Sequence, residues 1–274
     1  MNVATETCAL CPRLCRHTCP VAVGTGLEST TPTAIMALLV LPQQQPELSR
    51  GAVDLCTQCG ACEDYCGLDQ PVRDLLSEAR ATLHPPLAPW APPIIHGHSQ
   101  TVAVICGTTD WTADLSAMTE QNVATLRTTD HLGEAHRARS DAAAATMEQL
   151  ELLFAGRTAI VECHTCREAL EAASVSVEML DALLPRRPSR PTWRTCRCAA
   201  SAGVRTLQKC CGARGPLSTT HPSLADEMAL SLRKRLDGQA VYTPDARCAA
   251  HMQSAGANVF GPVDLLPPHP QTEE

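Results

Sequence analysis

Aromatic residues are scarce in this chain, since tryptophan, tyrosine and phenylalanine together make up 3% of its 274 residues. A single large domain ordinarily buries many aromatic side chains in its core. Hydrophobic residues still account for 44% of the chain, which is enough for globular cores. The length suits one large domain or two to three small ones. The shortage of aromatics favours the small domains.

Other absences exclude whole classes of protein. The formal net charge is -7, which argues against general nucleic-acid binding. The first residues lack the basic and apolar regions of a secretory signal, and the apolar run at 34–41 is too short to span a bilayer. Gly24 and Gly26 have no third glycine, because Ser29 stands there, so a dinucleotide fingerprint is excluded. We expect a cytoplasmic protein, with peripheral attachment to the cytoplasmic face of a membrane left open.

Cysteine, by contrast, is abundant, with 16 residues. In a cytoplasmic chain such thiols are reduced and available to metal rather than paired in a disulfide framework. Eight of them form two runs: Cys8, Cys11, Cys15 and Cys19, then Cys56, Cys59, Cys62 and Cys66. The second run has the C-x2-C-x2-C-x3-C spacing by which bacterial ferredoxins hold a [4Fe–4S] cluster, and the first has one extra residue in its middle gap.

In two-cluster ferredoxins, the fourth cysteine of each run binds the other cluster. We therefore predict two [4Fe–4S] clusters. The predicted ligand sets are Cys8, Cys11, Cys15 and Cys66 for one cluster, and Cys56, Cys59, Cys62 and Cys19 for the other. The alternative is a pair of structural zinc sites, but zinc usually binds two separated pairs of cysteines, so the spacing favours iron–sulfur.

Hydrophobic periodicity predicts several elements along the chain. In the first unit, residues 1–83, we expect helices over 33–41, capped near Thr31 or Thr33 and ended by Pro42, and over 72–83. Five prolines in residues 84–93 predict an extended linker, placed at 84–100. The second unit, 101–184, should contain strands at 101–107 and 158–162 and helices at 141–154 and 167–184. The third unit, 192–266, should contain a helix at 223–236 and strands at 240–243 and 258–260, before a loose tail at 267–274.

Units two and three read as a weak internal repeat, because in each a strand leads to a cysteine pair or a cysteine–histidine pair at a helix start. In the second unit the pair is Cys163 and Cys166, which also resembles a redox dithiol at a helix N-terminus. In the third it is Cys248 and His251. We expect His131, His136 and His164 on the surface rather than among metal ligands.

Cys210-Cys211-Gly212 indicates metal ligation or dithiol chemistry, because adjacent cysteines seldom bridge to each other and glycine permits the turn that points both sulfurs to one centre. The alternative is two small buried residues in a tight turn. Eight basic residues and no acidic ones lie between 182 and 225, with Arg197 and Lys209 next to cysteines. Three interpretations of this positive charge stay open. It would stabilise thiolates or an anionic cluster, it would bind an acidic partner protein, or the segment is a solvated basic loop without a role at the site.

These motifs together resemble the iron–sulfur proteins with cysteine-rich CCG domains. That family includes heterodisulfide reductase B and C subunits and the iron–sulfur subunits of glycolate oxidase and anaerobic glycerol-3-phosphate dehydrogenase. The resemblance implies an α+β chain: an all-α two-cluster ferredoxin domain, then two α/β CCG-type domains. Carried over, the second CCG domain would use Cys196 or Cys198, then Cys210 and Cys211, then Cys248, with His251 in place of the last cysteine. A third cluster there is implied, at a potential raised by imidazole as in Rieske centres. The first CCG domain is degenerate, because it keeps Cys106, Cys163 and Cys166 but lacks the central Cys-Cys-Gly, so we expect no cluster there.

The resemblance implies an electron-transfer subunit. Electrons would pass from a flavoprotein dehydrogenase subunit, through two [4Fe–4S] clusters, to a site at Cys210 and Cys211, and on to quinone or another carrier, which could be membrane-bound. One alternative is disulfide or heterodisulfide reduction catalysed by those two cysteines. Another is a zinc-stabilised scaffold without redox chemistry.

Overall fold

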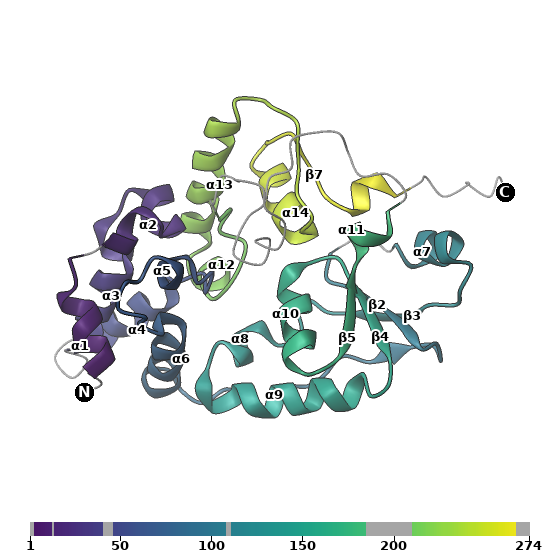
Figure 1. Cartoon of the computed structure of the whole chain (residues 1–274), viewed down its shortest axis with the longest axis horizontal. Coiled ribbons are helices and arrows are strands. Elements are labelled where there is room, and N and C mark those ends of the chain that lie inside the picture. Colours follow the sequence, from purple (N-terminus) through teal and green to yellow (C-terminus); the bar gives the residue numbers. More distant parts are fainter. Residues whose placement is uncertain (1–2, 13, 41–45, 108–110, 185–209, 267–274) are drawn as a thin grey trace.

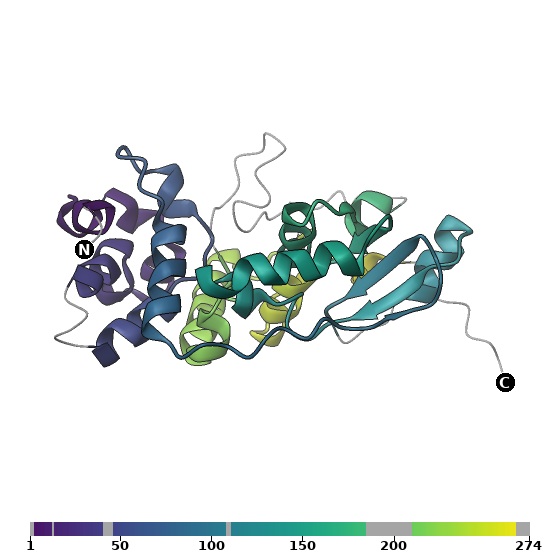
Figure 2. The ribbon, with the colours of Figure 1, turned by 90° about the horizontal axis from the view of Figure 1, so that it is seen from below.

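The computed structural model describes residues 3–12, 14–40, 46–107, 111–184 and 210–266. The chain combines a helical N-terminal unit, a sheet unit with five strands and a smaller C-terminal unit with two strands, so the predicted α+β class is confirmed at that level. Figure 1 shows the N-terminal helices at one end of the molecule and the five-stranded sheet at the other. Helices α13 and α14 of the C-terminal unit lie between them, as the view from below in Figure 2 also shows.

The N-terminal unit consists of short helices. They are α1 (Val3–Leu10), α2 (Pro20–Thr25), α3 (Pro32–Val40), α4 (Pro46–Asp54), α5 (Ala61–Asp64) and α6 (Val72–Leu83), with 3-10 turns at Leu14–His17 and Glu28–Thr30. The Thr31 hydroxyl accepts a hydrogen bond from the Ala34 N–H at 3.2 Å, so the predicted cap of α3 is confirmed. Predicted helix 72–83 coincides with α6. Pro42 lies outside the described residues.

The core of this unit is small, and cysteines contribute to it. Ile35, Met36 and Leu76 are almost completely buried, and they pack in one cluster with Cys8 and Cys62. Because the thiols occupy core positions, whatever they bind becomes part of the packing that holds these helices together.

The sheet unit contains β1 (Ile95–His96), β2 (Thr101–Ile105), β3 (Ala124–Arg127), β4 (Thr158–Val161) and β5 (Ser176–Met179). The strand order is β1-β3-β2-β4-β5, and every pairing is parallel except that of β1 with β3. Its helices are α7 (Thr112–Thr119), α8 (Glu134–Arg137), α9 (Ser140–Leu153), α10 (His164–Ala172) and α11 (Leu180–Leu183). Strands β2 and β4 and helix α9 match predicted elements to within two residues at each end.

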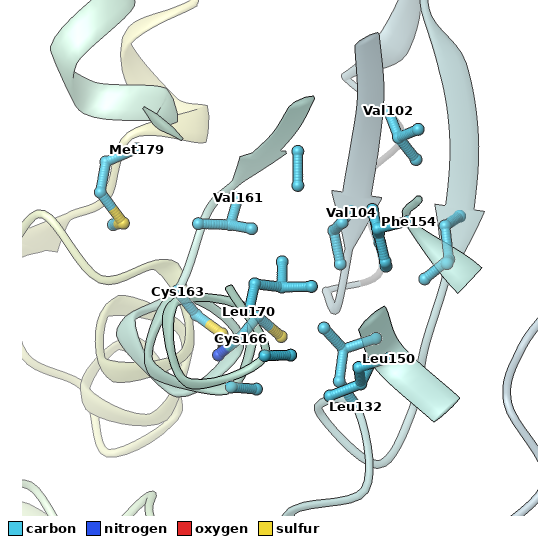
Figure 3. Close-up of a cluster of buried hydrophobic side chains, with 14 of the residues drawn as sticks. Val102, Val104, Leu132, Leu150, Phe154, Val161, Cys163, Cys166, Leu170 and Met179 are labelled. Carbon is cyan, nitrogen blue, oxygen red and sulfur yellow. Dashed lines mark hydrogen bonds between the residues drawn. The ribbon is translucent and has the colours of Figure 1, made fainter. Parts of the chain in front are cut away.

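Both faces of this sheet are covered, which explains the continuous apolar run of β2. Val102 and Val104 point to the face covered by α9 and α10, as the close-up in Figure 3 shows. Ala103 and Ile105 point to the opposite face, where they pack with Trp111 beside α7 and with α11. Because β3, β2 and β4 are parallel neighbours, the residues that follow these strands lie at one edge of the sheet.

Two predictions for this region were wrong or incomplete. The helix predicted over 167–184 ends at Ala172, because Ser174 takes a left-handed backbone (φ 57°) and the alternating segment after it pairs with β4 as β5. The extended linker predicted over 84–100 has no helix or strand at 84–93, but it contains β1 and so contributes a strand to the sheet. Trp90 is buried in the core of the sheet unit, and its indole N–H donates to Asp130 Oδ2 at 2.7 Å.

The C-terminal unit contains α12 (Leu217–Thr220), α13 (Pro222–Leu236), β6 (Val241–Tyr242), α14 (Ala246–Ser254), β7 (Val259–Phe260) and a 3-10 turn at Val263–Leu265. Strands β6 and β7 pair in parallel, and α13 and both strands lie where they were predicted. Cys196, Cys198, Arg197 and Lys209 lie outside the described residues. Within the described ranges, each helix is too short or too polar to cross a bilayer.

Candidate metal centres

The eight thiols of the N-terminal unit gather into two groups. Burial, and after it the neighbouring thiols of Cys15, Cys11 and Cys66, raise the pKa of Cys8 to about 12. Burial also raises the pKa of Cys15, and the neighbouring thiols of Cys11 and Cys66 add to that rise. Thus Cys66, the last cysteine of the second run, lies with the first three cysteines of the first run.

The second group mirrors the first. Burial raises the pKa of Cys19 to about 12, and the thiols of Cys59 and Cys56 add to that rise. Burial likewise raises the pKa of Cys62, whose neighbours are Cys56, Cys59, Cys19 and, last, Cys15. Within each group the neighbouring thiols come from one predicted ligand set, and Cys15 is also a neighbour of Cys62, so the two groups adjoin; the ligand sets themselves stay a prediction. A metal bound by these thiols would replace their protons.

Local backbone geometry aims donors at these sulfurs. Gln58 and Asp69 adopt left-handed backbones, with φ of 59° and 48°. The Gln58 N–H donates to Cys56 Sγ at 3.2 Å, and the Gln70 N–H donates to Cys66 Sγ at 3.3 Å. Hydrogen bonds to ligand sulfurs are one means by which a protein sets the potential of an iron–sulfur cluster.

One buried cation lies beside the second group. Burial raises the pKa of Cys56, and the Arg80 guanidinium opposes that rise. Arg80 is 2% exposed and is held by a hydrogen bond from Nη2 to the Val53 carbonyl oxygen and by Asp54, whose Oδ1 is 3.6 Å from Arg80 Nε. A positive charge here favours thiolates and a reduced cluster.

The Cys-Cys-Gly turn lies in the C-terminal unit, deeply buried. Cys210, Cys211 and Cys248 are 5%, 1% and 4% exposed, and Cys248 Sγ lies 2.8 Å from Cys211 Sγ. Gly212 has φ +92°, and a Cβ there would approach the Ala225 backbone at 2.9 Å, so only glycine suits this turn. His251 Nε2 lies 3.2 Å from the Ala225 carbonyl oxygen. The assignment of Cys210, Cys211, Cys248 and His251 as metal ligands stays a prediction, as does that of Cys198, which lies outside the described residues.

The turn is packed directly on the helical unit. Cys210 shares a hydrophobic cluster with Val21 and Met228, and Cys19 packs against it. Further along, a Cβ at Gly215 would lie 2.8 Å from the Thr57 carbonyl group, in the loop between Cys56 and Cys59. The Cys-Cys-Gly segment therefore adjoins the second thiol group.

Glu134 of α8 fastens the sheet unit to the same segment. Its Oε1 accepts from the Gly215 N–H at 2.9 Å, and its Oε2 accepts from Arg247 Nη1 at 2.7 Å. Burial acts to raise the pKa of Glu134, but the Arg247 guanidinium and the Gly215 N–H outweigh it and hold that pKa below its usual range. This carboxylate thus joins the sheet unit to the C-terminal unit.

A third group was not predicted as a whole. Cys106, His131, Cys163 and Cys166 each offer one ligand atom, and these four atoms lie within 4.8 Å of one another. Figure 3 shows Cys163 and Cys166 at the start of α10, close to Val161 and Leu170. His131 was expected on the surface, but it faces the cysteines. The expectation was wrong for His164 as well, which is only 5% exposed, although it is outside this group.

A family model described as a 4Fe-4S dicluster domain matches residues 7–70. Neither the curated proteins nor the solved structures gave a match to this chain. The matched range contains both predicted cysteine runs and about a quarter of the sequence. It ends before the sheet unit, so membership of the CCG family is not confirmed.

Proposed function

We propose that this iron–sulfur protein is an electron-transfer subunit. It accepts electrons from a flavoprotein dehydrogenase subunit, passes them through two [4Fe–4S] clusters to the site at Cys210 and Cys211, and delivers them to quinone or another carrier. The observation that supports this most strongly is the dicluster match over residues 7–70, together with the two thiol groups that the structure brings together there.

The spatial order of the thiol groups supports a route. The first group, at Cys8, adjoins the second group through the proximity of Cys15 and Cys62. The second group adjoins the Cys-Cys-Gly turn, because Cys19 packs on the hydrophobic cluster that contains Cys210. These contacts support a route for electrons from one group to the next inside the protein.

For the third centre we propose a cluster ligated by Cys198, Cys210, Cys211 and Cys248, with His251 as a further ligand. The contact between the sulfurs of Cys211 and Cys248 supports a shared centre. A carbonyl oxygen only accepts hydrogen bonds, so His251 Nε2, next to the Ala225 carbonyl, would carry the ring proton. That leaves Nδ1 as the nitrogen for coordination.

A cavity of about 360 Å³ at the meeting point of the three units suits the acceptor. Its lining includes Arg80, beside the second thiol group, and the apolar side chains of Leu87 and Pro216. A mixed wall of this kind fits a carrier with an apolar body and a polar end. Leu87→Trp should hinder reduction of the acceptor while the reduction of the clusters by dithionite is unchanged.

Iron and sulfide analysis with EPR on anaerobically purified protein tests the proposal. Two clusters give about eight irons per chain and a third gives about twelve. The double variant Cys210→Ser/Cys211→Ser should lower the content from about twelve irons to about eight. Eight irons in both proteins would remove the third centre, and a colourless, zinc-loaded protein would remove the redox function altogether.

Kinetics separate electron transfer from catalysis by the same cysteines. If Cys210 belongs to an electron-transfer site, Cys210→Ser slows the passage of electrons between partners. If Cys210 catalyses disulfide reduction, Cys210→Ser abolishes turnover and leaves the EPR signals of the first two clusters intact. Burial of Cys210 and Cys211 favours transfer, since a bulky disulfide has little access to them. Substantial 2-hydroxy-acid dehydrogenase activity in the chain alone would contradict the need for a flavoprotein partner.

A further inference from the structure

We infer that Cys106, His131, Cys163 and Cys166 form a four-coordinate site for a single zinc ion in the sheet unit. This site is separate from the thiol groups of the proposed electron route. Its evidence is the position of the four ligand atoms, the way the fold presents them, and a set of hydrogen bonds that fixes the loops around them.

The ligand atoms are at the spacing of one metal ion. All four lie within 4.8 Å of one another, and Cys163 Sγ is 3.6 Å from His131 Nδ1. Zinc–sulfur bonds of 2.3 Å and zinc–nitrogen bonds of 2.0–2.1 Å, in tetrahedral geometry, separate the ligand atoms by about 3.5–3.8 Å. Small side-chain movements therefore complete the coordination. A cubane cluster attaches each thiolate to a different iron and would need the sulfurs further apart.

The topology of the sheet explains the convergence. Cys106 directly follows β2, His131 follows β3 in a short turn, and Cys163 follows β4 after one residue. These strands are adjacent and parallel, so their carboxyl ends meet at one edge. Cys166 comes from the first turn of α10, where its N–H donates to Cys163 Sγ at 3.4 Å.

The turn that presents His131 has a costly backbone. His131 and Leu132 are consecutive non-glycine residues with left-handed φ angles of 49° and 59°. Such a conformation costs roughly 1–2 kcal/mol per residue and persists where the surroundings impose it. Here Arg137 imposes it, because its guanidinium donates to the carbonyl oxygens of both residues at 2.9 and 3.1 Å. Thr128 Oγ1 also accepts from the Leu132 N–H at 3.1 Å.

Glu162 fixes the loop that carries Cys106, after β2. Its carboxylate accepts from the backbone N–H groups of Cys106 and Gly107, both at 2.7 Å, and from the Trp111 indole N–H at 2.8 Å. The loop after β2 is thereby tied to the residue before Cys163. Outer contacts of this kind orient ligands in natural metal sites.

The donor set indicates zinc and a structural role. Three cysteines and one histidine fill all four tetrahedral positions, which is the pattern of closed zinc sites. Cys163 and Cys166 are completely buried, so no position is left for a substrate. On binding, the three thiols release their protons to solvent and the imidazole binds through Nδ1. The nearby Arg137 guanidinium offsets the negative charge of the resulting centre.

The test uses the full chain, produced with zinc and iron both available and purified anaerobically. We expect about one zinc per chain, and X-ray absorption at the zinc edge should show three sulfurs and one nitrogen. Cys166→Ser and His131→Ala should each lower the zinc content at least fivefold while the iron content stays at the wild-type level. His136→Ala is the matched control, because its ring bonds the Ala88 carbonyl and is outside the group, and it should keep its zinc.

The absorption measurement needs no variant, so it decides the matter even where a substitution prevents folding. Zinc below about a tenth of an ion per chain would overturn the inference. So would four sulfurs without nitrogen, iron bound at these residues, or a Cys163–Cys166 disulfide in the anaerobic protein. Loss of iron in Cys62→Ser with zinc unchanged would show that this site is independent of the electron route.

Discussion

Replacement of Gly215 by alanine tests the contact between the Cys-Cys-Gly segment and the second thiol group. Gly215 has φ +71°, and an added Cβ would lie 2.8 Å from the Thr57 carbonyl carbon and oxygen. The left-handed backbone costs alanine roughly 1–2 kcal/mol. Crowding against a backbone that cannot move aside adds roughly 1–3 kcal/mol. The total expected loss of unfolding free energy is therefore roughly 2–5 kcal/mol.

Gly156 provides a matched control. Its φ is also +71°, but nothing lies within 4 Å of the Cβ that alanine would add. Gly156→Ala should thus lose only the backbone contribution, roughly 1–2 kcal/mol. The difference between the two variants isolates the contact with Thr57.

Urea unfolding of anaerobic protein with matched iron content measures this difference. At an m value of about 2 kcal/mol/M, a contact cost of 1–3 kcal/mol lowers the midpoint of Gly215→Ala by roughly 0.5–1.5 M relative to Gly156→Ala. A stopped-flow measurement should also show slower oxidation of the clusters by the acceptor in Gly215→Ala alone. Equal midpoints and equal rates would refute the packing of this segment on the Cys56–Cys59 loop.

Three further outcomes are expected. Glu134→Gln should destabilise the protein at pH 7, where the carboxylate is ionised. Because folding lowers the pKa of Glu134, the ionised carboxylate stabilises the protein above its unfolded-state pKa, and this stabilisation is lost as pH falls through the folded-state pKa. The difference in urea midpoint between wild type and variant should therefore disappear on acidification. A difference independent of pH would mean that the ion pair with Arg247 is not the source of the stabilisation. Cys66→Ser should remove the EPR signal of the first thiol group and leave that of the second, and the reverse result would contradict the grouping. Arg80→Met should lower the reduction potential of the second cluster in an EPR-monitored titration, because a nearby positive charge favours the reduced state, and an unchanged potential would mean that Arg80 does not act on Cys56.

The helices and strands that the sequence predicted well are those with a strong local signal. The helix from Val72 to Leu83 places apolar residues on one face, and β2 is a short apolar run, so each follows from periodicity alone. The helix predicted over 167–184 was wrong beyond Ala172, because the helical pattern of apolar residues continues through Ser174, whose left-handed backbone ends the helix. Strand β3 was missed because its four residues have no distinctive pattern until β1 and β2 pair with them.

The same difference applies to the sites. Cysteine spacing predicted two thiol groups of the N-terminal unit, since three ligands of each set lie in one short segment. His131 was not predicted as a ligand, because its proximity to Cys106 and Cys163 depends on the order of three strands rather than on distance along the chain. A strand assigned to Ala124–Arg127 would have been the one available signal, since it places His131 at the same edge of the sheet.

The geometry also explains how the sheet unit can hold a metal ion without a Cys-Cys-Gly turn of its own. An iron–sulfur cluster needs ligand atoms that are further apart than those of a single zinc ion. The four ligand atoms at Cys106, His131, Cys163 and Cys166 have the closer spacing that zinc requires. The Glu134 carboxylate accepts a hydrogen bond from the Gly215 N–H, on the segment that follows the Cys-Cys-Gly turn, and so links this unit to that segment. A rigid sheet unit would therefore hold that turn against the second thiol group. It follows that removing zinc should slow electron transfer to the acceptor without changing the iron content or the cluster EPR signals.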